Sequence, residues 1–228
     1  MRRKNVKQIS HSRVFPKYLK QLMNEFLSWF VLKVNASKPF IPVINEVLNQ
    51  TNQKKINYIE LNAGGGIETV KPFLDENVEV NISDFNEFNV QNNGVYLFVN
   101  SFHLLSVDKA IKALNDITEK GHPIVIVEGN NDSLWQIVGM TFFVPLTVLI
   151  ASPFVKPFRF TRLIFTYVIP ILPLILVIDG CLALIKLYNP NDLKELVSKL
   201  NTTSYEWKMG KNDNGRGGKI IYLTGIKK

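Results

Sequence analysis

The chain has 228 residues, of which 46% are hydrophobic and 20% charged, and this composition excludes a disordered protein. A single cysteine excludes a disulfide scaffold or a zinc site built on cysteines, and three scattered histidines do not suggest a metal cluster. The formal net charge of +8 is concentrated at one end, because residues 1–38 hold nine basic residues and one acidic residue while the remainder is neutral.

The chain therefore begins with a basic arm. Its expected partners are anionic lipid headgroups or nucleic acid, and a solvated tail without a partner is the alternative. Because the rest of the chain is neutral, a nucleic-acid-binding surface spread over the fold is not expected. No short apolar run or small-residue cleavage site of a signal peptide follows the basic start, so we expect the soluble part of the chain to lie in the cytosol.

An amphipathic helix is predicted between Lys17 and Val34, where apolar residues recur at helical spacing and polar residues fill the opposite face. Pro16 lies near its start and the 39–42 stretch lies beyond its end. Such a helix could cover a sheet or lie on a membrane surface.

Short buried strands alternate with helical stretches in the next part of the chain. The predicted strands are 57–61, 78–83, 95–100 and 124–127, and the predicted helices are 68–74 and 108–119. This alternation favours a parallel sheet with crossover connections, which places the fold in the α/β class. After it, residues 191–200 are predicted to form a helix, and 204–209 and 219–226 an antiparallel hairpin around a turn-rich loop at 211–218.

An apolar region at 137–185 interrupts this pattern. It contains one uncharged run of 19 residues (137–155), one of 16 (163–178) and a basic link between them. A membrane helix needs about 20 apolar residues, and Pro145, Pro153, Pro170 and Pro173 are expected to break straight helices. The basic link argues against two full spans, because it would place the sheet outside the cytoplasm. A hairpin that enters one leaflet avoids that conflict, and a buried insertion or an oligomer interface is the alternative.

The most specific chemical signal is the strand–loop–helix segment at 60–66, which reads Glu60-Leu61-Asn62-Ala63-Gly64-Gly65-Gly66. Glycines allow a ligand to approach the backbone closely, and amides at the start of the following helix face its carboxylate or phosphate. Asp84 ends the next strand, 24 residues after Glu60, where a carboxylate can accept both ribose hydroxyls of a nucleoside cofactor. Thr69 replaces the further glycine that a dinucleotide fingerprint needs, which disfavours NAD.

Segment 60–66 resembles the first motif of class I S-adenosylmethionine-dependent methyltransferases, and Asp84 matches their ribose-binding acid. The resemblance extends to a poorly characterised bacterial subgroup that carries a hydrophobic insertion, through residues 15–19, 152–167 and 179–180. It implies an α/β fold with a Rossmann-like methyltransferase sheet, an inserted apolar helical hairpin, and S-adenosyl-L-methionine as the cofactor.

The chain also departs from that family. Asn62 stands where the motif has its first glycine, and Leu104 stands where the subgroup has a second histidine. Only ten residues, 85–94, separate Asp84 from the next strand, where the usual fold places two helices, a strand and the acid that contacts adenine. We therefore expect a sheet shortened around its third strand.

Four parts follow from these observations. They are a basic arm and amphipathic helical region (1–55), a Rossmann-like cofactor-binding core (56–136), a hydrophobic hairpin insertion (137–185), and a C-terminal helix and β-hairpin that complete the sheet (186–228).

The candidate site residues lie at strand ends and in the insertion. The resemblance and the strand ends assign cofactor binding to Glu60, Asn62, Gly64, Gly66, Asp84 and Asn100. His103 is the candidate general base, because histidine titrates near neutral pH, and a structural role is the alternative. Candidate substrate or lipid contacts are Glu128, Asn130, Arg159 and Arg162; helix capping by Asn130 and structural pairing of the arginines are the alternatives.

These features predict a membrane-associated methyltransferase that acts on an amphiphilic small molecule or lipid, from the cytoplasmic side of a membrane (the inner membrane, in a bacterium). The alternative is a degenerate, non-catalytic membrane-bound scaffold, which the short 85–94 connection favours. A nucleic-acid methyltransferase that uses the basic arm is a weaker alternative, because the rest of the chain is neutral. The methyl acceptor and the oligomeric state are left open.

Overall fold

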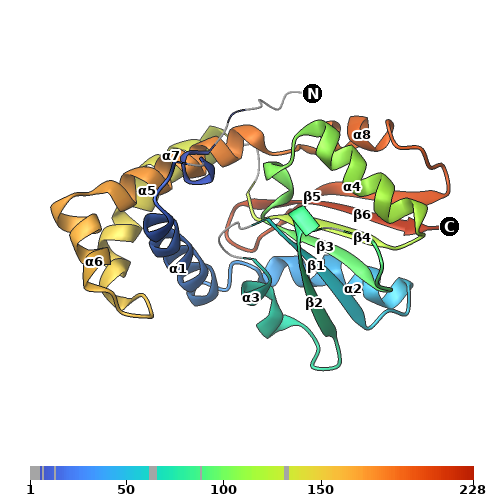
Figure 1. The fold of residues 1–228 in the computed structure, drawn as a ribbon, viewed down its shortest axis with the longest axis horizontal. Helices are drawn as coiled ribbons and strands as arrows, with labels where there is room; N and C mark the ends of the chain where they lie inside the picture. Colours follow the sequence, from blue (N-terminus) through green and yellow to red (C-terminus); the bar gives the residue numbers. More distant parts are fainter. Residues whose placement is uncertain (1–5, 7, 13, 62–65, 88, 131–133) are drawn as a thin grey trace.

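A six-stranded, mostly parallel sheet flanked by helices forms the body of the protein (Figure 1). The computed structural model describes residues 6, 8–12, 14–61, 66–87, 89–130 and 134–228. The strands are β1 (Lys55–Glu60), β2 (Glu79–Asp84), β3 (Val95–Val99), β4 (Ile124–Glu128), β5 (Tyr205–Asp213) and β6 (Lys219–Lys227), in the order β2-β1-β3-β4-β6-β5. The first four strands are parallel, and β6 and β5 are antiparallel to their neighbours. The α/β expectation is confirmed, and the arrangement is compatible with a Rossmann-like fold.

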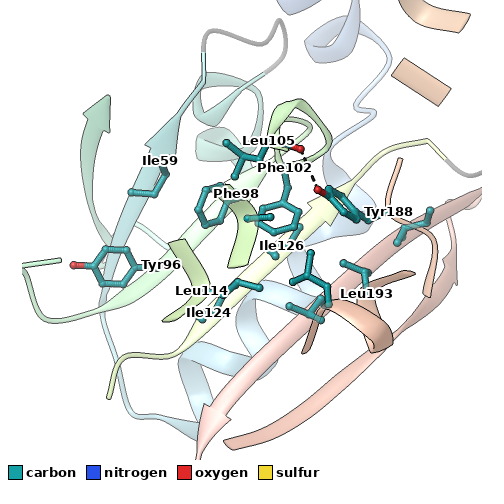
Figure 2. Close-up of a cluster of buried hydrophobic side chains, with 14 of the residues drawn as sticks. Ile59, Tyr96, Phe98, Phe102, Leu105, Leu114, Ile124, Ile126, Tyr188 and Leu193 are labelled. Carbon is teal, nitrogen blue, oxygen red and sulfur yellow. Dashed lines mark hydrogen bonds between the residues drawn. The ribbon is translucent and has the colours of Figure 1, made fainter. Parts of the chain in front are cut away.

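Both faces of the sheet are covered, which explains why β3 and β4 are buried along their whole length and are apolar except for Glu128 at the end of β4. Helices α4 (Val107–Glu119) and α8 (Pro190–Val197) pack on one face, whose core Figure 2 shows. There the Tyr188 hydroxyl donates a hydrogen bond to the Leu105 carbonyl at 3.0 Å. Helices α2 (Ile41–Gln50) and α3 (Ile67–Val70) pack on the other face.

The connection from β2 to β3 is short, and its last residues pack against β1. Its described residues include the 3-10 turn η4 (Phe85–Glu87), and the side chain of Asn57 donates to the carbonyls of Asn92 and Asn93 at 3.3 and 3.2 Å. Gly94 has a φ of +132°, and a Cβ there would lie 2.7 Å from the Lys55 carbonyl oxygen, so glycine is required. In the described part of the sheet, β2 lies at one edge and pairs with β1.

Several boundaries differ from the sequence expectation. Helix α1 (Lys17–Lys33) lies where it was predicted, but α2 was not predicted, because the 39–42 stretch indicated a helix end. Pro42 instead occupies the first turn of α2, where a missing N–H removes no hydrogen bond. Helix α3 is shorter than predicted and continues as the 3-10 turn η3 (Lys71–Phe73). Strand β5 continues to Asp213, so the hairpin loop shrinks to residues 214–218.

The insertion projects from one end of the sheet beside α1 (Figure 1). It consists of α5 (Leu134–Ala151), η6 (Ser152–Phe154), α6 (Phe160–Leu163), the π-helical η7 (Ile164–Val168) and α7 (Ile171–Lys186). The expectation that every proline breaks a helix is wrong for two of the four. Pro173 lies in the first turn of α7, where it removes no helical hydrogen bond. Pro145 lies inside α5, which continues through it with α7 packed alongside.

The segment Trp135–Phe154 is long and apolar enough to cross a membrane. Its mean hydropathy is 2.0, and 17% of this apolar stretch is buried in the fold. The helical stretches Phe160–Val168 and Ile171–Lys186 are long and apolar enough only when they are taken together as one span, and the chain bends by 78° between them. Length and composition do not by themselves separate a membrane helix from the core helix of a soluble protein.

Candidate functional site

A cavity of about 520 Å³ lies between the carboxyl ends of β3 and β4, helix α1 and the insertion. Its polar end carries four of the residues that the sequence singled out, Asn100, His103, Glu128 and Asn130. Its opposite wall is apolar and comes from α1, α5 and α7, through Met23, Phe26, Leu27, Phe30, Phe143, Val144 and Leu176. The cavity is thus amphiphilic, with a polar end against the sheet and an apolar end against the insertion.

His103 and Glu128 form a buried pair at the polar end. His103 lies in the 3-10 turn η5 (Phe102–Leu104) just after β3, and Glu128 is the last residue of β4. The His103 Nδ1 atom lies 3.0 Å from Glu128 Oε2, and the backbone N–H of His103 donates to Oε1 at 3.0 Å. Because β3 and β4 are adjacent parallel strands, their ends bring these two side chains together.

Asn100 and Asn130 shape the same end of the cavity. Asn100 adopts a left-handed φ of 49°, and its Oδ1 accepts a hydrogen bond from the backbone N–H of Gly129 at 2.7 Å. Asn130 Oδ1 accepts from the Gln136 side chain of α5 at 2.6 Å. Asn100 therefore joins the ends of β3 and β4, and Asn130 joins the sheet to the insertion.

The predicted cofactor residues on β1 and β2 lie outside this cavity lining. Glu60 and Asp84 are partners in the register of β1 and β2, so two carboxylates stand side by side at the sheet's carboxyl edge. Burial raises the pKa of Glu60, and the nearby charges of Asp84 and Glu68 raise it further. Asp84 Oδ1 also accepts from the Asn86 backbone and side chain, at 2.7 and 2.8 Å.

Gly66 precedes α3, and a Cβ there would lie 2.5 Å from the Tyr58 hydroxyl oxygen. Only a glycine lets the backbone pass this close to the rigid tyrosine ring. The predicted cofactor residues Asn62 and Gly64 lie outside the described residues.

The N-terminal segment also contributes to the cavity, which sequence reasoning missed. Asp179 of α7 accepts hydrogen bonds from the backbone N–H groups of Ile9 and Ser10, at 2.6 and 2.9 Å. His11 lines the cavity beside them. Although part of its ring is exposed, loss of hydration and the positive charges of Lys20 and Lys186 lower the pKa of His11 to about 4. The only signal in the sequence was Asp179 itself, a lone acid in an apolar segment.

Arg159 and Arg162 lie away from the cavity and pair with Glu25 of α1. Arg159 makes a forked contact, with its Nε 2.8 Å and its Nη2 2.7 Å from the two carboxylate oxygens. Arg162 is fully buried, donates to the carbonyls of Val155 and Pro157, and lies 2.5 Å from Glu25 Oε2. This geometry favours structural pairing for Arg162, whose side chain presents no surface to a lipid.

The outer surface of the insertion is apolar. Phe142, Phe143 and Ile150 of α5 are 60–70% exposed. The segment from η6 to the first residue of α6 adds Phe154, Phe158 and Phe160 at 64–70%. An apolar surface of this kind marks a contact with a membrane or another protein.

No protein-family model matches the chain, and a search of curated proteins returned no match.

Proposed function

We propose that the protein is a methyltransferase that uses S-adenosyl-L-methionine and acts on an amphiphilic acceptor at a membrane surface. The observation that carries this proposal is the juxtaposition at the carboxyl edge of the sheet. Glu60 and Asp84 stand side by side there, Gly66 opens the following helix, and an amphiphilic cavity adjoins the next two strand ends. Open α/β sheets bind their ligands at this edge.

The described residues fit such a cofactor in part. The paired carboxylates of Glu60 and Asp84 would accept the ribose hydroxyls, and Gly66 leaves room that a Cβ would fill. Asn100, at the edge of the cavity, would face the methionyl end. When bound, the cofactor supplies an electrophilic methyl group; the chain's own residues hold the acceptor in line and keep water from it.

The apolar surface of the insertion supports a membrane as the partner. We propose that the insertion is embedded in one leaflet and does not span the bilayer. Helix α1 packs along the insertion through Leu22, Met23 and Phe26, and it also carries the exposed Lys17 and the half-buried Lys20. If α5 crossed the bilayer, these lysines would enter the hydrocarbon region, which is unfavourable by about 2.5 kcal/mol or more for each charge. A shallow insertion leaves them at the headgroups.

Calorimetric titration of the detergent-purified chain with S-adenosylhomocysteine tests the cofactor. We expect micromolar binding that Asp84→Ala weakens about tenfold or more, because the variant loses a charged acceptor. Asp75→Ala is the matched control, since Asp75 accepts the same two bonds from Asn77 (2.8 and 2.8 Å) but lies before β2. Unchanged affinity in Asp84→Ala would refute the ribose assignment.

The second candidate is a membrane-bound scaffold without catalysis. The short connection between β2 and β3, which leaves β2 as the edge strand among the described residues, favours it because adenine then has less protein around it. Absence of binding up to millimolar S-adenosylhomocysteine, in a chain shown to be folded by circular dichroism, would support the scaffold.

A further inference from the structure

The segment between α5 and the end of α6 combines basic and aromatic side chains in the insertion tip (residues 154–162), which lies away from the sheet and beside α1 (Figure 1). Its three phenyl rings are 64–70% exposed, and a lysine among them is exposed as well. Phenylalanine is usually buried in a folded protein, so three exposed rings on one short segment indicate a surface that a partner covers. The residues are Phe154, Lys156, Phe158 and Phe160.

The charges of the insertion tip are unbalanced. Residues 134–178 contain Lys156, Arg159 and Arg162 and no acidic residue. Both arginines share one carboxylate, that of Glu25 on α1, with one Nη2 atom 2.7 Å from Oε1 and the other 2.5 Å from Oε2. Lys156 forms no ion pair with any residue that the structure describes. Three cations therefore meet one anion, which leaves a net positive charge beside the exposed rings.

The two arginines differ in what they can reach. Arg162 is fully buried and donates to the carbonyls of Val155 and Pro157, so it fixes the backbone of the tip and adds charge from below. The Arg159 side chain is 30% exposed, and two of its three nitrogens, Nε and Nη2, face Glu25. A guanidinium has five N–H donors, so Arg159 retains the capacity to donate to a further anion.

The fold holds the insertion tip in place before any partner binds. Val155 is fully buried in the core that α1, α5 and α7 share. The buried hydroxyls of Ser152 and Thr166 are hydrogen-bonded at 3.1 Å, and the Tyr18 hydroxyl of α1 bonds to Thr161. The two outer basic residues are therefore presented on a fixed backbone, which lowers the entropic cost of binding a ligand.

We propose that the insertion tip binds the phosphate of an anionic phospholipid, with Lys156 and Arg159 at the headgroup and the three phenyl rings in the acyl region. This inference deepens the membrane part of the function proposed above and rests on it. Guanidinium groups donate paired hydrogen bonds to phosphate oxygens, and long basic side chains reach headgroups from an apolar surface.

Charge and apolarity together select this partner. A free phosphate ion would match the net positive charge but would leave three phenyl rings in water. An uncharged apolar partner would cover the rings but would leave the cations without a counter-charge. A leaflet that contains anionic phospholipid offers phosphate and hydrocarbon within one interface, so it satisfies both parts of the tip.

Vesicle flotation tests the lipid class. The full chain is diluted from detergent into vesicles of phosphatidylcholine, or of phosphatidylcholine mixed with phosphatidylglycerol, at about 0.5 M salt. The salt limits attraction between exposed charges to about 4 Å, which screens the basic arm. The variants are Lys156→Gln and the double variant Lys156→Gln/Arg159→Gln. The matched control is Arg2→Gln/Arg3→Gln, which removes two positive charges from the arm.

We expect wild type to bind the mixed vesicles about tenfold or more tightly than phosphatidylcholine alone. Lys156→Gln should lower this preference about fivefold, because each basic residue near an anionic surface contributes about that factor. The double variant should lower it further, and the arm control should keep the wild-type preference. A wild-type preference in Lys156→Gln and in a double variant that unfolds in urea like wild type would overturn the proposal, as would an equal loss in the arm control.

Further outcomes separate the partners and the proposals. Release of the chain from mixed vesicles by millimolar inorganic phosphate would assign the site to a soluble anion and overturn the lipid. Equal binding to both kinds of vesicle would refute only the anionic headgroup. A folded chain that binds neither would refute the membrane part of the proposed function as well, while the titration with S-adenosylhomocysteine tests the cofactor independently of all these results.

Discussion

At the scale of single residues, Glu60 is the clearest example of a side chain whose placement opposes stability. Its pKa is raised in the folded state, first by burial and then by Asp84 and Glu68. The folded chain therefore binds a proton more readily than the unfolded chain, so Glu60 destabilises the fold at neutral pH and this effect is relieved as pH falls toward the raised pKa. Residues held at such a disadvantage often serve a ligand.

Replacement of Glu60 by Gln separates function from structure. We expect Glu60→Gln to melt at a higher temperature at neutral pH, because the repulsion by Asp84 and Glu68 is removed. The same variant should bind S-adenosylhomocysteine about tenfold more weakly, because it loses a charged hydrogen-bond acceptor.

The exposed Glu76 provides the control, since Glu76→Gln should change neither the melting temperature nor the affinity. A Glu60→Gln variant that loses both stability and binding would show that Glu60 is structural.

Single residues also show how far the sequence could predict the site. His103, Asn100 and Glu128 were recognisable because each follows or ends a strand whose buried apolar run is plain. Their grouping was also predictable, because parallel neighbours end at the same edge. The Nδ1–Oε2 contact was not, because it depends on how the 3-10 turn after Asn100 directs the His103 ring.

At the scale of elements, the junction between α1 and the insertion depends on Glu25. Burial disfavours its ionised form, but hydrogen bonds from Arg159 and Gln21 outweigh burial and lower its pKa. Arg162 is fully buried beside it. Loss of the carboxylate would leave a buried cation without a counter-charge.

We expect Glu25→Gln to lower the free energy of unfolding by about 3 kcal/mol or more, measured in urea. The control is Glu46→Gln, which breaks the exposed Glu46–Lys208 pair (48% and 46% exposed) and should change the free energy by less than about 1 kcal/mol. Equal effects in the two variants would contradict a special role for Glu25.

The pH dependence of stability at the same junction follows from the direction in which folding shifts the pKa of Glu25. Because the pKa of Glu25 is lowered on folding, its contribution is fully present above pH 4.5, its ordinary pKa, and is lost as pH falls through the lowered value. Wild type should therefore lose stability relative to Glu25→Gln on acidification below pH 4.5. Parallel stability curves for the two proteins in that range would contradict this account.

Elements differed in how well the sequence predicted them. The strands and α1 were predictable because their hydrophobic periodicity and apolar runs can be read from a short stretch of sequence. Helix α2 and the length of β5 were not, because a proline in a first turn resembles a helix end and because β5 gains its last residues by pairing with β6. The pairing of Arg159 with Glu25 spans 134 residues of chain, and no local pattern encodes it.

At the scale of the whole molecule, the apolar surface of the insertion determines the expected location. We predict that the chain binds vesicles of phosphatidylcholine and phosphatidylglycerol and resists extraction by high salt. Replacing Phe154, Phe158 and Phe160 by serine should weaken vesicle binding about tenfold or more, because each phenyl group contributes about 1.5–3 kcal/mol when buried.

Ile82→Ser, which removes another exposed apolar side chain (53%) on the edge strand β2, should leave vesicle binding unchanged. Release of the wild-type chain from cell membranes by salt alone would refute an embedded hairpin and leave an attachment through the basic arm.

The contacts that hold the N-terminal segment have a consequence for how the chain is made. Ile9 bonds to a side chain 170 residues later, and the apolar face of α1 packs on helices that are synthesised after the sheet strands β1–β4. A nascent chain therefore leaves the ribosome with a basic amphipathic helix whose docking partner does not yet exist. If the chain acts at a membrane as proposed, a lipid surface would cover this helix during that interval, before the sheet is complete.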